Sequence, residues 1–482
     1  MKKTSFKYLI CILLIFIGAF NTPMTLASII SAIIIGVDLG LQFCKRPSVI
    51  CCKGIVCLLA FQNLAIGLGA HITGNSSSSL SLLTQIPFII IAMQWLILFI
   101  FKHNGKITMS RHRIIYLLLM VMILLSFFNG IGAIQAILIN IRNLTVFFMA
   151  FELGKHNIYS QNDLAEFEKY LIRLGVIILA AGIVLLIGGY PLYKSIGIRE
   201  VYIAKGSPLV REGLDDRFTT TLIRKQYTRM GSIFYEPVNL GYFFSCVFTI
   251  TWFGVWTDNK HKKILVSFIM LVALILTFGK GGYLITAIVF IYAYAQKALG
   301  FLKKTLGQKN IRLLGICLII FAGTAFSIYY YQNIGAAASP HFWGIMQTWQ
   351  SILKRPLGHG IGNGGNAATL YGSSAAVSWL ASGGETQLMS FFYQIGIQGG
   401  LIFILCVIKT MLPPQTRTHF GNEIFIVIPF ALLGLSLLQD NTFTPQCIVL
   451  FMILQGAANR IYSNAPPANE ITYCGLETGA KI

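Results

Sequence analysis

The sequence predicts an all-α polytopic membrane protein with about 12–14 transmembrane helices and two large extracytoplasmic loops. Of its 482 residues, 55% are hydrophobic and only 11% are charged, against roughly 25% charged residues in an ordinary soluble domain. A soluble chain of this length cannot bury so much apolar surface, so the composition excludes a cytosolic enzyme, a secreted domain and a disordered chain. The formal net charge of +21 fits the basic cytoplasmic loops of membrane proteins, and we do not expect nucleic-acid binding.

A bilayer span needs about 20 mostly apolar residues. Stretches of this kind lie at 8–20, 24–43, 49–70, 80–101, 114–129, 131–152, 171–190, 234–256, 264–279, 281–300, 313–330, 387–410, 423–438 and 444–461. Lys2 and Lys3 followed by the first stretch resemble a signal peptide. Because another apolar run begins near Met24, we expect an uncleaved first helix instead.

Lysine and arginine in the short loops set the orientation, because such residues collect on the cytoplasmic side. Alternate short loops carry them and the loops between do not, which predicts a chain with both termini inside. The predicted organisation is N-terminal helices at 1–190, a basic extracytoplasmic loop at 191–231, central helices at 232–330, a second extracytoplasmic loop at 331–386, C-terminal helices at 387–461 and a cytoplasmic tail at 462–482. We therefore expect a multi-pass protein of a bacterial inner membrane with its site on the extracytoplasmic face.

The first long loop is basic, with eight Lys or Arg residues against four Asp or Glu residues. Arginine offers a planar fork matched to phosphate oxygens, so the loop favours an anionic ligand, although a solvated charged loop with internal ion pairs has the same composition. The loop ends in Arg229 and Glu236, followed by Pro237, which suits the first turn of a helix. We expect Glu236 to orient Arg229 through a charge-assisted hydrogen bond at the membrane surface.

The second long loop predicts an amphipathic helix followed by a glycine-rich segment. Ser339-Pro340 is a helix-start signal, and apolar residues then recur at helical spacing, as expected of a helix lying in the membrane interface: Phe342, Ile345, Met346, Trp349, Ile352 and Leu353. The segment 355–366 contains Arg355, His359 and five glycines. Its glycines allow close backbone approach to a ligand, or form a flexible linker.

Three charged residues near or within the spans need an explanation. Glu385 opens the span after the second loop, where a carboxylate is either favoured by the helix dipole or acts as a general base. Charges inside spans usually face the bundle interior or a cavity. Lys280 is expected at an outer helix break, and Arg142 is expected to pair with Glu152 or with helix carbonyls. The cysteines form no metal pattern, and Asp215-Asp216 is the only Asp pair in the loops, so we expect neither a metal nor a cofactor.

Four motifs in this order resemble the O-antigen polymerase/ligase superfamily, which includes the Wzy-type polysaccharide polymerases and the O-antigen ligase. They are Arg229-x-Gly-Ser-Ile-Phe-x-Glu-Pro-x-x-Leu-Gly, Thr-Phe-Gly-Lys280-Gly-Gly, Arg355-Pro-Leu-Gly-x-Gly-Ile-Gly-Asn and Glu385-Thr-Gln-Leu followed by Gln-x-Gly-x-x-Gly-Gly400. The resemblance covers roughly residues 140–460 and departs from the family at two places. The usual Ser-Arg-Gly is here Gly-Lys280-Gly, and the histidine of the ligase is here Glu385, which favours a polymerase.

The resemblance implies a GT-C-like, metal-independent glycosyltransferase that uses undecaprenyl-diphosphate-linked oligosaccharide at the outer face of the membrane, with a chain-length regulator as a further partner. The implied diphosphate-binding residues are Arg217, Arg224, Arg229, Lys280 and Arg355. The implied catalytic residues are Glu385, Arg229, Glu236 and His359. A ligase that moves finished glycan is the alternative enzyme. A flippase fits less well, because we see neither inverted halves nor a use for two long outer loops.

Overall fold

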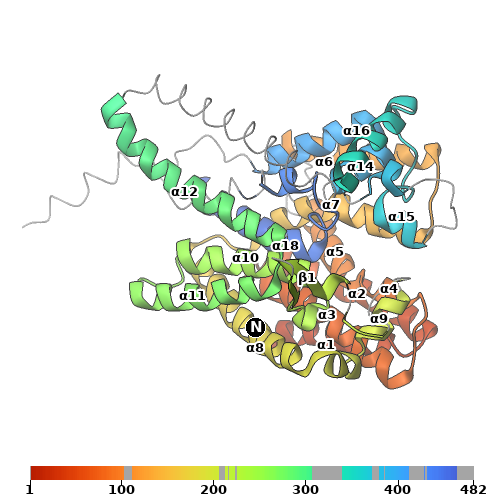
Figure 1. Ribbon diagram of the computed structural model, residues 1–482, viewed down its shortest axis with the longest axis horizontal. Helices are drawn as coiled ribbons and strands as arrows, with labels where there is room; N and C mark the ends of the chain where they lie inside the picture. Colours follow the sequence, from red (N-terminus) through yellow and green to blue (C-terminus); the bar gives the residue numbers. More distant parts are fainter. Residues whose placement is uncertain are drawn as a thin grey trace, which may run out of the picture.

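The chain folds into a bundle of helices with one short β-hairpin (Figure 1). In this computed structural model the described residues are 2–101, 111–205, 212–214, 216–222, 225–306, 339–371, 379–384, 386–411, 428 and 431–463.

The N-terminal helices follow one another with short connections. They are α1 (Lys2–Gly18), α2 (Thr22–Lys45), α3 (Val49–Thr73), α4 (Leu80–Leu83), α5 (Ile86–Phe101), α6 (Arg111–Ser126), the 3₁₀ turn η1 (Phe127–Asn129), α7 (Ile134–Asn157), α8 (Gln161–Ser195) and α9 (Ile198–Ala204). Their ends carry the expected signals. Ser160 and Asp163 form a capping box at the start of α8, and Gly74 ends α3 with a φ of 66°.

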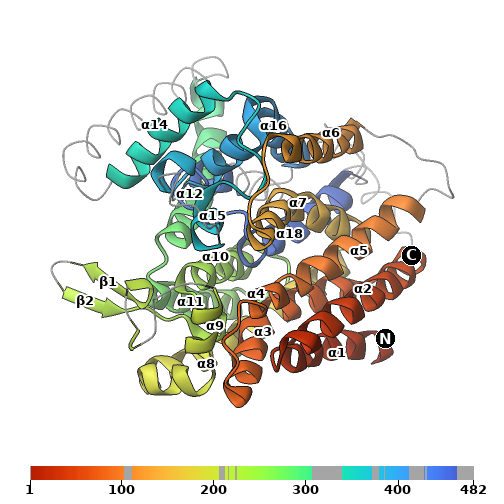
Figure 2. The ribbon, with the colours of Figure 1, turned by 90° about the vertical axis from the view of Figure 1, so that its right-hand side faces the viewer.

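The remaining elements include the hairpin near their start and end with α18, which packs against α7. They are η2 (Asp216–Phe218), β1 (Thr219–Leu222), β2 (Lys225–Thr228), η3 (Ser232–Phe234), α10 (Pro237–Phe253), α11 (Lys260–Thr277), α12 (Lys280–Leu306), α14 (Ser339–Lys354), α15 (Gly365–Tyr371), η4 (Trp379–Ser382), α16 (Gln387–Met411) and α18 (Pro445–Ser463). The two strands pair antiparallel, with Thr219 opposite Thr228. Figure 2 shows this hairpin at one edge of the molecule.

Six helices in the described part of the chain are long and apolar enough to cross a bilayer: Thr22–Lys45, Val49–Thr73, Leu80–Phe101, Ile134–Asn157, Gln161–Ser195 and Gln387–Thr410. Shorter apolar helices accompany them at Thr4–Gly18, Ile114–Asn129, Pro237–Phe253 and Lys280–Ala295. The protein is therefore a multi-pass membrane protein. The apolar stretches predicted within the described ranges all fall on helices, whereas 313–330 lies outside those ranges and 423–438 lies only partly inside them.

The first predicted loop contains more regular structure than its composition suggested. Helix α8 continues to Ser195 through a break at Gly189, where φ is 56°, and α9 and the hairpin follow it. In the second loop, α14 begins at Ser339 as predicted. Its apolar residues divide between two sides, since Ile352 is fully buried, whereas Trp343, Met346, Trp349 and Leu353 are exposed.

Glycines let the central helices approach closely. Helices α7 and α18 share the most extensive contact of the bundle. A Cβ at Gly456 would lie 2.1 Å from the carbonyl oxygen of Phe151, and one at Gly154 would lie 2.2 Å from that of Ile453. Such contacts between backbones are typical of membrane helices, where small residues replace bulky ones at the interface.

Candidate functional site

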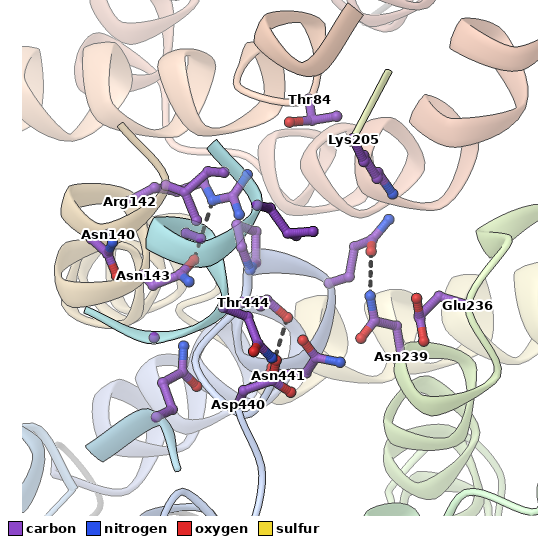
Figure 3. Close-up of a pocket in the computed structure, with 18 of the residues that line it drawn as sticks. Thr84, Asn140, Arg142, Asn143, Lys205, Glu236, Asn239, Asp440, Asn441 and Thr444 are labelled. Carbon is purple, nitrogen blue, oxygen red and sulfur yellow. Dashed lines mark hydrogen bonds between the residues drawn. The ribbon is translucent and has the colours of Figure 1, made fainter. Parts of the chain in front are cut away.

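A polar cavity of about 240 Å³ lies where the ends of several helices meet (Figure 3). Residues near the N-termini of α10, α16 and α18 line it, together with α3, α7, α9, η2 and α15. Its polar lining consists of Gln62, Ser81, Thr84, Asn140, Arg142, Asn143, Tyr202, Lys205, Arg217, Glu236, Asn239, Asn366, Tyr371, Gln387, Ser390, Asp440, Asn441, Thr444 and Gln446. Polar and charged groups inside a membrane bundle are costly and usually functional. This cavity is therefore the candidate site.

The best-defined element of the site is a carboxylate–guanidinium pair. Arg217 Nη1 donates to Glu236 Oε2 at 2.8 Å, and the Tyr202 hydroxyl lies 3.4 Å from the same oxygen. The Glu236 side chain is 9% exposed, whereas the Arg217 side chain, which also faces the cavity, is 40% exposed. The nearby Glu236 carboxylate raises the pKa of Arg217, and burial raises the pKa of Tyr202. Glu236 Oε1 is buried and accepts no hydrogen bond from the described residues.

The turn before α10 holds Glu236 in place. Ser232 and Tyr235 adopt left-handed backbone conformations, with φ of 47° and 55°, which cost free energy in residues other than glycine. Tertiary hydrogen bonds hold the turn: Ser232 Oγ donates to the carbonyl of Ile178 at 2.8 Å, and Asn63 Nδ2 donates to that of Phe234 at 2.5 Å. The Gly-Ser-Ile-Phe-x-Glu-Pro motif thus encodes a clamped turn that presents a carboxylate at the N-cap of α10, where the helix dipole favours it.

Two further cations reach the cavity from other elements. Arg142, on α7, donates through Nε to Asn143 Oδ1 at 3.2 Å. Lys205, which caps α9, has its ammonium group 5.7 Å from the centre of the Tyr202 ring. Burial lowers the pKa of Lys205 to about 8. Figure 3 shows the two cations entering from different sides of the cavity, with Glu236 and Asn239 together on another wall.

Amide side chains connect the other walls. Asn239 Nδ2 donates to Gln446 Oε1 at 2.6 Å, which ties α10 to α18. Asn366 Nδ2 hydrogen-bonds Asp440 Oδ2 and ties α15 to the segment before α18. Cavities that bind sugars need such groups, since amides and carboxylates offer donors and acceptors at fixed positions for hydroxyl groups.

Most of the glycine-rich segment approaches the chain itself, whereas Gly364, Gly365 and Asn366 at its end line the cavity. Helix α16 is broken at Gly396, where φ is 75°. The segment fills the break: the amides of His359 and Gly360 donate to the carbonyls of Tyr393 and Gln394 at 2.8 and 3.1 Å, and Ile397 donates to the carbonyl of Pro356 at 2.9 Å. Its glycines are needed because the segment also crosses the backbone of the α6–α7 connection, where Gly132 N donates to the carbonyl of Ile361.

Of the sequence-predicted site residues, the structure brings Glu236 and Arg217 together in the cavity. The expected pairing of Glu236 with Arg229 is wrong, because Glu236 pairs with Arg217. Arg229 instead donates to two backbone carbonyls, from Nε to Thr277 at 3.2 Å and from Nη1 to Arg217 at 3.1 Å. It holds the loop against the end of α11, and burial lowers its pKa.

Arg229, Lys280, Arg355 and His359 do not line the cavity. Lys280 and Arg355 are exposed. His359 stacks on Tyr393, with ring centres 4.0 Å apart, and its Nε2 lies 3.2 Å from the carbonyl of Ser351. The motif around Lys280 has a packing role, since Gly279 and Gly282 lie against Gly241 of α10.

Arg224 and Glu385 lie outside the described residues. Gly384 and Gln387, close to position 385 in the chain on either side, line the cavity.

Two lining cations were not assigned to the site from the sequence. Arg142 was expected to pair with Glu152 or with helix carbonyls, but among the described residues it forms no ion pair and its Nε donates to the side chain of Asn143. A signal existed, because Asn140 and Asn143 flank Arg142 and lie three residues apart, which places polar groups on one face of an otherwise apolar helix. Lys205 had no such signal, since it is one of eight basic residues in its loop.

Comparisons with known proteins add no relative. No family model matches the chain, and neither the curated proteins nor the solved structures contain a significant match. Within the described ranges, no group of three or more His, Cys, Asp or Glu residues is placed to hold a metal ion.

Proposed function

We propose that this protein is a polysaccharide polymerase that transfers glycan from an undecaprenyl-diphosphate-linked repeat unit to an acceptor repeat unit at the extracytoplasmic face of a bacterial inner membrane. The observation that carries this proposal is the polar cavity within a multi-pass bundle, lined among the described residues by three cations, many amides, Asp440 and the ion-paired Glu236. A lipid-linked sugar diphosphate needs cations for its diphosphate, amides for its hydroxyl groups and a carboxylate for the proton of the acceptor. It also needs a site within a membrane protein.

The chemistry assigns roles to these groups. Displacement at the anomeric carbon forms a bond to the acceptor oxygen and releases the lipid diphosphate, whose charge fixed cations stabilise. The acceptor hydroxyl transfers its proton to a carboxylate. Glu236 lines the cavity, and its buried Oε1 has no hydrogen-bond partner among the described residues. Glu385 is the other candidate, because its chain neighbours Gly384 and Gln387 line the same cavity.

The test is chain extension by the purified, reconstituted protein supplied with a lipid-linked repeat unit. The wild type should give a ladder of longer lipid-linked glycans, and Glu236→Gln should extend chains at least tenfold more slowly. Lys280→Gln is the matched control, because Lys280 belongs to a family motif but is exposed and outside the cavity. It should extend chains normally. Movement of glycan to a different acceptor would favour the ligase, and movement of intact lipid across the bilayer without a new bond would favour the flippase.

The proposed orientation has its own test. Gln226, in the exposed hairpin strand β2, belongs to the loop expected outside. In a background without native cysteines, Gln226→Cys should react with a membrane-impermeant thiol reagent in intact cells. Labelling only after membrane rupture would place the loop in the cytoplasm, where the proposed lipid-linked glycan is not extended.

A further inference from the structure

The three cations that line the cavity among the described residues differ in whether they form an ion pair. Arg217 shares a hydrogen bond and opposite charge with Glu236. Arg142 and Lys205 take part in no ion pair within the described chain. The hydrogen bond found for the Arg142 side chain leaves from Nε, so it does not use the two Nη groups that form the outer edge of the guanidinium. Lys205 contacts the face of the Tyr202 ring, an interaction that leaves its donors available.

Positive charges without a partner are costly inside a membrane bundle, and they usually mark a ligand pathway. The position of Arg142 adds to this cost, since it lies eight residues, or roughly 12 Å of helix axis, beyond the first residue of α7. The beginnings of α10, α16 and α18 also line the cavity, and helix N-termini favour negative charge. Asn143, Thr84 and Tyr371 in the lining supply further hydrogen-bond donors.

We propose that Arg142 and Lys205 form the phosphoryl subsite of the cavity, which binds a phosphate or diphosphate group, while Arg217 is retained by its ion pair with Glu236. For a lipid-linked donor, this assignment rests on the proposed function. It moves the diphosphate from the loop arginines predicted by sequence to an arginine of a transmembrane helix and a lysine at the end of α9.

The experiment measures binding directly, so that it does not depend on chain extension. The full chain in lipid nanodiscs is titrated with farnesyl diphosphate, with inorganic pyrophosphate and with farnesol. Farnesyl diphosphate should bind and farnesol should not, because the subsite recognises the charged group. Tighter binding of farnesyl diphosphate than of pyrophosphate would show that the bound diphosphate belongs to a lipid. Equal binding of the two would show that the subsite binds a soluble anion and would contradict a lipid-linked ligand.

The variants locate the subsite. Arg142→Gln and Lys205→Met should each weaken farnesyl diphosphate binding at least tenfold, and Arg142→Lys should give an intermediate loss, because lysine keeps the charge without the fork. The charge-neutral double change Arg217→Gln with Glu236→Gln should weaken it by less than Arg142→Gln does. Lys280→Gln should bind as the wild type does. Thermal unfolding shows whether each variant has folded. If Arg142→Gln has not folded, Arg142→Lys is tested in its place.

A pH titration gives a signature that a purely structural lysine lacks. Burial lowers the pKa of Lys205 to about 8, so the affinity for farnesyl diphosphate should fall as pH rises through that value. The charged and titratable groups facing Lys205 are Glu236, Arg217, Arg142 and Tyr202. The pKa of Tyr202 is raised, so the ammonium is the group that loses charge over this range. Lys205→Arg should bind tightly and remove the fall.

Two results would overturn the proposal. One is wild-type affinity in both Arg142→Gln and Lys205→Met, and the other is loss of binding confined to the Arg217 variant. Failure of the proposed function looks different: in that case the wild type binds farnesyl diphosphate through Arg142 and Lys205 but forms no longer glycan from a lipid-linked repeat unit.

Discussion

Replacing Glu236 by glutamine separates two roles that its geometry allows. Glutamine keeps the shape of the side chain and an oxygen that can accept the hydrogen bond from Arg217, so the turn before α10 should still form. If Glu236 serves only to position Arg217, the change weakens one charge-assisted hydrogen bond, a contribution of about 1.5–3 kcal/mol. That corresponds to a roughly 10- to 150-fold decrease in the rate of chain extension, at 1.36 kcal/mol for each factor of ten. Because Arg217 is 40% exposed, solvent screening places the expected loss near the lower end.

If Glu236 instead accepts the proton of the acceptor hydroxyl, its removal costs typically 10²–10⁴-fold in turnover. The assay is single-turnover extension of a lipid-linked repeat unit, with donor binding measured separately and the rate followed against pH. A loss above about 100-fold with unchanged donor affinity and a lost acidic limb of the pH profile identifies a base. A loss near tenfold with a retained limb identifies a positioning residue. Extension within threefold of the wild type would refute the assignment of this cavity as the reacting site.

Four further predictions follow from the same structure. Glu385→Gln should bind donor normally and lose about 10²–10⁴-fold in turnover if position 385 supplies the base, and normal extension would assign the proton to Glu236. Arg229→Ala removes two hydrogen bonds to backbone carbonyls, so it should lower thermal stability by roughly 1–3 kcal/mol and increase proteolysis of the loop; unchanged stability would contradict the role as a clamp. Gly456→Ala should destabilise the protein by about 1–3 kcal/mol through overpacking, whereas Gly434→Ala, with open space around it, should unfold like the wild type. Equal unfolding temperatures of the two variants would contradict the packing argument. Burial lowers the pKa of His359 from its ordinary 6.5, so its contribution to stability should be full above about pH 6.5 and decline as pH falls below it, and His359→Asn should remove that part of the acid dependence of unfolding.

The sequence was sufficient for the class of fold, because hydropathy is a property of each segment by itself. The apolar stretches within the described ranges fall on helices, and Ser339-Pro340 begins α14 as expected. The partners of charged groups could not be predicted in the same way. Glu236 is nearer in sequence to Arg229, yet it pairs with Arg217 across 19 residues, because η2 and the hairpin fold the loop back on itself.

The same distinction explains why the glycine-rich segment 355–366 left both a ligand contact and a flexible linker open. A glycine permits close approach without specifying what approaches. Gly241 and Gly282 bring α10 against α12, and Gly360 meets the carbonyl of Gly130. In these cases the neighbour is another part of the backbone, which only the tertiary structure identifies. Arg142 shows the converse, since a charged residue in an apolar helix announces a special environment but does not say which one.

The break in α16 at Gly396 has a consequence for engineering the protein. Its free backbone groups are satisfied by the segment from Pro356 to Gly360, and unsatisfied backbone groups are not tolerated at membrane depth. The segment from Pro356 to Gly360 and helix α16 are therefore a single folding unit, not an interchangeable loop on a fixed scaffold. A chimera that exchanges residues 355–366 alone with those of a related chain should misassemble, and one that exchanges the segment together with α16 should insert correctly.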